Sequence, residues 1–116
     1  MPDDFPFKVA SLLEQCGGNR EIGKIILDEF LIQASDDIQE IETFLASGNL
    51  PQVGKIGHRL KGSAGVLGAE KLQSLCLALE IACKEGNAEE TSKVYGELKA
   101  EAERCCAAVP EASTQL

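Results

Sequence analysis

Aromatic residues and histidine are scarce in this sequence. Its 116 residues include four Phe, one Tyr, no Trp and a single His. A chain of this length has room for one hydrophobic core, and 44% of its residues are hydrophobic. We therefore expect one domain with an aliphatic core, which is typical of a helical bundle.

Positive charge, long apolar segments and paired cysteine motifs are also lacking. The formal net charge of -8 argues against general binding to nucleic acid or to an anionic membrane. No apolar run approaches the roughly 20 residues of a membrane span, and the acidic start gives no indication of a signal peptide. Five cysteines without a Cys-x-x-Cys motif favour reduced thiols. We expect a monomeric, cytoplasmic protein.

Three Gly-Asn pairs, at residues 18–19, 48–49 and 86–87, divide the chain. Gly favours the end of one helix, and Asn caps the beginning of the next. With a fourth break at Gly68-Ala69, they predict five helical segments: 6–16, 19–47, 50–67, 69–85 and 88–108.

The predicted fold class is all-α, an up-down antiparallel four-helix bundle with a short additional N-terminal helix. Segment 19–47 carries the clearest helical periodicity, and no alternating strand pattern is long enough to compete with it. The bundle is expected to span residues 1–109. The polar tail, residues 110–116, begins with Pro and is expected to be frayed.

Segment 50–67 contains four internal glycines: Gly54, Gly57, Gly62 and Gly65. Each costs about 0.8–1 kcal/mol relative to Ala in a helix, or roughly 3–4 kcal/mol together. A requirement other than helix stability must therefore set these positions. On a helical wheel His58 points about 160° away from the apolar face. Gly54, Gly62 and Gly65 fall on the same outer face, where they would let a partner surface approach the ring closely.

The charge pattern also singles out His58. Residues 43–69 contain no Asp or Glu, whereas Lys55, Arg59 and Lys61 all lie there. This predicts a locally positive surface around the histidine of an acidic protein. Lys61 lies one turn from His58 on the same side, and Lys55 and Arg59 are interpreted as general docking charges or as solvated side chains.

Residues 58–69, His-Arg-Leu-Lys-Gly-Ser-Ala-Gly-Val-Leu-Gly-Ala, resemble the pattern of histidine-containing phosphotransfer domains of bacterial multistep phosphorelays. That pattern is His, any residue, Leu, Lys, Gly, Ser, a small residue and then Gly-Ala, followed by a helix with spaced Leu and a Leu-Glu pair. The continuation is matched by Leu72, Cys76, Leu79 and Glu80. One departure is Gly57, where the family usually has Ala.

The resemblance implies that His58 is the phosphoacceptor and that Lys61 stabilises the charge of the phosphoryl group. It also implies that Gly62 leaves room for a receiver domain to dock. A neutral imidazole is a competent nucleophile for such a step. Ser63 is a hydrogen-bond donor either to phosphate or to its own helix. The implied partners are receiver domains of response regulators or of hybrid sensor histidine kinases. Mg²⁺ is expected on the receiver, with no cofactor or metal on this chain.

Two alternatives stay open at this point. The first is a helical module that docks receiver domains without being phosphorylated. The second is a small metal or redox bundle, which the single histidine and the cysteine spacing disfavour. The sequence has no nucleotide-binding motif, so we expect a phosphocarrier and not an enzyme with kinase activity of its own.

Overall fold

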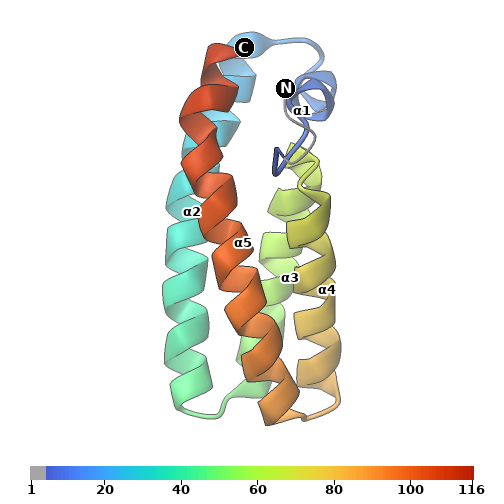
Figure 1. Cartoon of the computed structure of the whole chain (residues 1–116), viewed down its shortest axis with the longest axis vertical. Helices are drawn as coiled ribbons and strands as arrows, with labels where there is room; N and C mark the ends of the chain where they lie inside the picture. Colours follow the sequence, from blue (N-terminus) through green and yellow to red (C-terminus); the bar gives the residue numbers. More distant parts are fainter. Residues whose placement is uncertain (1–4) are drawn as a thin grey trace.

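The computed structural model describes residues 5–116, which form five helices and no β-strand (Figure 1). The helices are α1 (Val9–Gln15), α2 (Arg20–Ala46), α3 (Leu50–Leu67), α4 (Glu70–Lys84) and α5 (Ala88–Thr114). The four long helices run along the 41 Å axis of the molecule, and α1 lies near the end where α3 turns into α4. The predicted up-down bundle with a short N-terminal helix is confirmed.

The Gly-Asn pairs set three of the helix boundaries. The side chains of Asn19, Asn49 and Asn87 accept hydrogen bonds from backbone N–H groups of the following turn, at 3.1, 3.3 and 3.0 Å. The Gly before each Asn has a positive φ, at 81°, 72° and 68°. Each pair therefore ends one helix and caps the next.

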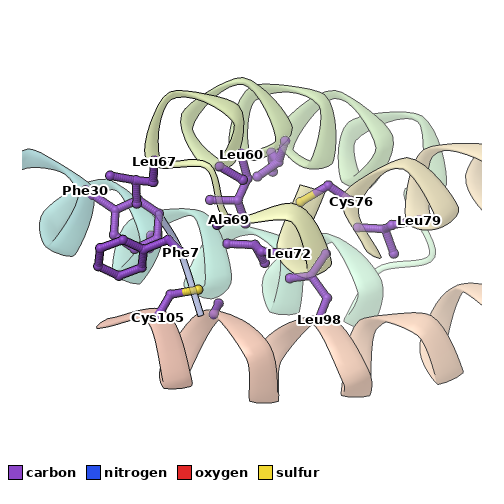
Figure 2. Close-up of a cluster of buried hydrophobic side chains, with 14 of the residues drawn as sticks. Phe7, Phe30, Leu60, Leu67, Ala69, Leu72, Cys76, Leu79, Leu98 and Cys105 are labelled. Atoms are coloured by element: carbon purple, nitrogen blue, oxygen red, sulfur yellow. The ribbon is translucent and has the colours of Figure 1, made fainter. Parts of the chain in front are cut away.

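The core is aliphatic, as expected, and every long helix contributes to it (Figure 2). Fully buried members come from α2, α3, α4 and α5: Leu27, Ile41, Leu60, Leu67, Leu72, Leu79 and Leu98. Phe7, which precedes α1, and Phe30 of α2 belong to the same cluster. None of the helices within residues 5–116 combines the length and apolar character that a membrane span requires.

The expectation of a frayed tail is wrong. Helix α5 continues through Pro110 to Thr114, although Pro removes a backbone donor and disfavours a helix interior. Ala112 is fully buried, and Leu116 packs on the core with its side chain facing Gly23 of α2. Tertiary packing therefore holds the last turns in place. The predicted boundary at residue 109 falls inside α5, and residues 1–4 of the predicted domain lie outside the described residues.

Candidate functional site

Helix α3 presents His58 to solvent. Val53, Ile56 and Leu60 bury the opposite face of the helix in the core, and the imidazole side chain is 70% exposed. The outward orientation expected from the helical wheel is therefore observed. The helix that carries the ring is capped by Asn49 at its beginning and ends at the left-handed Gly68.

Glu80 reaches the imidazole from the neighbouring helix α4. Its Oε2 lies 3.1 Å from His58 Nδ1. An ionised carboxylate only accepts hydrogen bonds, so in the neutral ring this contact assigns the proton to Nδ1. The lone pair is then on Nε2, which is the ring nitrogen free to react as a nucleophile.

Lys61 binds the other oxygen of the same carboxylate. Its Nζ lies 2.7 Å from Glu80 Oε1, and the Glu80 side chain is only 12% exposed. Burial acts to raise the pKa of Glu80, but the contacts with Lys61 and His58 outweigh it and hold that pKa below its usual value. Glu80 therefore stays ionised between two basic groups.

Arg59, interpreted from the sequence as a docking charge or a solvated side chain, pairs with carboxylates of α2 while its side chain stays 52% exposed. Its Nε donates to Asp37 Oδ1 at 3.0 Å, and its Nη2 donates to Glu40 Oε2 at 2.6 Å and also to Asp37. Asp37 is almost fully buried. Burial raises the pKa of Asp37 even though Arg59 and Gln33 act to lower it.

The positive surface predicted from the acid-free segment 43–69 is therefore largely neutralised in three dimensions. Glu80 lies against His58 and Lys61, and the carboxylates of α2 lie against Arg59. All of these acidic residues come from other helices, which a count along one segment does not register.

The glycines of α3 serve two purposes, and among the three predicted to share the outer face with His58 only Gly62 is surrounded by open space. A Cβ at Gly62 would have no neighbour within 4 Å. At Gly54 it would lie 3.3 Å from Cys83 Cβ, and at Gly65 it would lie 3.1 Å from Gln73 Nε2. Gly57 is buried against Leu79 in the same way. Three of the four glycines thus let α3 approach α4 closely.

Lys55 and Ser63 lie in different grooves. Lys55 lines a groove of about 500 Å³ between α3 and α4, which also includes His58 and Glu80. Ser63 lines a groove between α2 and α3 with Phe30 and Gln33. The structure therefore places Lys55 beside His58, whereas Ser63 does not share the groove of the imidazole.

Glu80 is the site residue that the sequence did not assign. The resemblance included it only as part of a Leu-Glu pair, and helical spacing places it next to the buried Leu79. Its contact with His58 depends on the register between α3 and α4, which no local pattern encodes. Within residues 5–116, no three His, Cys, Asp or Glu side chains are grouped so that they could hold a metal ion.

Residues 25–108 match the family model described as Hpt domain. The phosphorelay intermediate protein YPD1 of Candida albicans is 36% identical to this chain over 53 residues. That alignment covers 46% of this chain and 29% of YPD1, so the match spans less than a third of that relative.

Two solved structures share the helical fold. Histidine-containing phosphotransfer protein B (HptB) from Pseudomonas aeruginosa PAO1 superposes with a TM-score of 0.88 at 15% identity, covering 98% of this chain and 99% of that protein. The HPT domain of the Hpt sensor hybrid histidine kinase from Shewanella gives 0.82 at 22% identity, covering 97% of both chains. At such identities these likenesses concern the fold.

Proposed function

Because the chain belongs to the Hpt domain family, we propose that it is a phosphorelay intermediate that accepts a phosphoryl group on His58 from a receiver-domain aspartate and passes it to another receiver. The observation that supports this most directly is the exposed imidazole whose Nδ1 is held by Glu80. That contact leaves Nε2 as an outward nucleophile on α3.

In the transfer step, the lone pair of Nε2 attacks the phosphorus of the receiver's aspartyl phosphate. The new N–P bond forms as the P–O bond breaks, and the electron pair of that bond returns to the aspartate as a carboxylate. The ring keeps its proton on Nδ1 and becomes positively charged. Glu80 stabilises that charge at 3.1 Å, and no proton has to leave. The same atoms run the reverse transfer to a second receiver.

Gly62 supports access to the ring. It lies four residues after His58 on the exposed side of α3, where a Cβ would find no neighbour within 4 Å. A receiver can therefore approach the imidazole over bare backbone. Mg²⁺ is expected to be held by the receiver's own carboxylates, so this chain supplies only the nucleophile and the groups around it.

We further propose that the chain acts as a monomeric cytoplasmic carrier without kinase activity. Its five cysteines are free, which agrees with a reducing compartment. Incubation with labelled ATP alone is expected to leave the chain unlabelled.

The decisive experiment offers the protein a panel of phosphorylated receiver domains, including those encoded beside its gene. The wild type should acquire acid-labile phosphate, and His58→Gln should acquire none. A wild type that binds receivers but never takes label would refute the carrier function and favour a docking module.

A second experiment tests the positioning role of Glu80. Loss of a charge-assisted hydrogen bond costs about 1.5–3 kcal/mol, so Glu80→Ala should slow transfer about ten- to 150-fold. The control is Glu85→Ala at the exposed end of α4. Nitrogen NMR of the ring should also show that the Nδ1–H tautomer is lost in Glu80→Ala only; an unchanged tautomer would refute the assignment.

A further inference from the structure

The groove beside His58 has no role in the transfer step proposed above. It lies between α3 and α4 with a volume of about 500 Å³, and it is lined by Pro51, Gly54, Lys55, His58, Glu80, Cys83 and Lys84. Its floor is closed because α3 and α4 touch there: a Cβ at Gly54 would lie 3.3 Å from Cys83 Cβ. The groove is therefore open to solvent, and the imidazole of His58 forms part of its lining.

Two lysines line this groove, one from each helix. Lys55 precedes His58 by three residues on α3, and Lys84 follows Glu80 by four residues on α4, so each lies one turn from a site residue. Both are exposed, and within residues 5–116 no carboxylate lies within ion-pair distance of either. Their ammonium groups are available to a bound anion.

Lys61 does not supply enough charge for a phosphorylated ring. Its Nζ is already paired with Glu80 at 2.7 Å, and its side chain is 25% exposed. Once the ring is positive, Glu80 lies between two cations, so only one positive charge is left over. A phosphoryl group carries about 1.5–2 negative charges at pH 7. A further cation near it would therefore stabilise the phosphorylated state.

We propose that the groove is an oxyanion site in which Lys55 and Lys84 bind the phosphoryl oxygens while His58 carries phosphate. This inference rests on the proposed function and specifies which groups stabilise its phosphorylated state. The lysine side chains are long and flexible enough to reach over one helical turn. The role assigned to Lys61 by resemblance is then mainly to hold Glu80.

A structural role for these lysines is the competing explanation. Lys84 lies in the last turn of α4, where a cation also stabilises the helix dipole, and both lysines are positioned to attract an acidic receiver. A dipole effect changes the melting temperature. A docking effect changes the forward and reverse transfer rates together. Only stabilisation of the phosphorylated ring changes the equilibrium between phosphohistidine and aspartyl phosphate.

The test measures that equilibrium with the receiver domain that labels the wild type fastest. Lys55→Gln/Lys84→Gln should shift the distribution about tenfold toward the phosphorylated receiver. The matched control is Lys24→Gln/Lys93→Gln, which removes the same charge from exposed positions on α2 and α5 and should shift it less than about twofold. Thermal melts check that both double variants are folded.

Two results would overturn the oxyanion site: an equal shift in the control pair, and an unchanged equilibrium. If the equilibrium is unchanged but transfer is slower in both directions, the lysines are docking charges. Each of these results can be obtained only if the wild type accepts phosphoryl from a receiver domain. A wild type that no receiver labels would instead contradict the proposed function, so the two failures are distinguishable.

Discussion

Substitution of Gly62 separates access to His58 from helix stability, because Gly96 provides a matched control. Both glycines are exposed in helix interiors, Gly62 on α3 and Gly96 on α5, and a Cβ at either would have no neighbour within 4 Å. Only Gly62 lies near the imidazole. The two positions are therefore equivalent for helix stability and different for approach of a receiver.

The structure fixes the expected magnitudes. Ala is favoured over Gly in a helix interior by about 0.8–1 kcal/mol, and neither site offers a clash that would offset this gain. Gly62→Ala and Gly96→Ala should each raise the melting temperature by roughly 3–6 °C. A larger side chain at Gly62 must also be accommodated in the receiver interface, and overpacking costs about 1–3 kcal/mol. Gly62→Gln should therefore slow transfer about five- to 150-fold, and Gly96→Gln should leave it unchanged.

Thermal melts and single-turnover transfer from a labelled receiver measure the two effects on the same samples. Transfer by Gly62→Gln at the wild-type rate would refute the access argument. A loss of stability in Gly62→Ala would show that the open space around this glycine is occupied in solution. Equal slowing by the two Gln variants would point to a general effect on the bundle.

Three further predictions concern stability. Burial raises the pKa of Asp37, so its contribution to stability is greatest at acidic pH and is lost as the pH rises through that pKa. Asp37→Asn should gain stability relative to the wild type in urea titrations from about pH 3 to about pH 7, and a flat or falling difference would contradict this. Gly68→Ala should lose about 1–3 kcal/mol, since φ is 69° and a Cβ would lie 3.1 Å from Lys8 Cβ; an unchanged urea midpoint would exclude that strain. Deletion of residues 110–116 should lower the free energy of unfolding by about 1–3 kcal/mol through loss of the buried Ala112 and of Leu116, whereas unchanged stability would restore the frayed tail.

Local signals in the sequence were sufficient for the fold. The range predicted for α3, 50–67, agrees with the structure at both ends, because Asn49 and Gly68 act within one turn of the helix they bound. The same kind of signal failed at Pro110, where packing of Ala112 and Leu116 overrides the local preference of proline. Local rules describe boundaries well where no distant contact competes with them.

The site was predicted less completely, because its charges come from three helices. His58 and its exposure follow from the periodicity of α3 alone. The partners of Lys61 and Arg59 do not, since Glu80 and Asp37 lie about 20 residues away along the chain and meet them only after the helices pack. The absence of acidic residues from one segment describes the charge of one helix only. The charge of the folded surface also depends on the carboxylates of the neighbouring helices.

The glycines of α3 affect both the stability of the helix and the geometry of the site. Gly54, Gly57 and Gly65 cost the helix roughly 2–3 kcal/mol, and each lies where a Cβ would come within 3.1–3.3 Å of α4. Because their side chains are absent, α4 packs close enough for Glu80 to lie 3.1 Å from His58 Nδ1. Three of the glycines therefore permit the close packing of α3 on α4 that accompanies the contact between Glu80 and the ring, and Gly62 leaves the surface open. The proton position on the imidazole and the access to it thus depend on different glycines of the same helix.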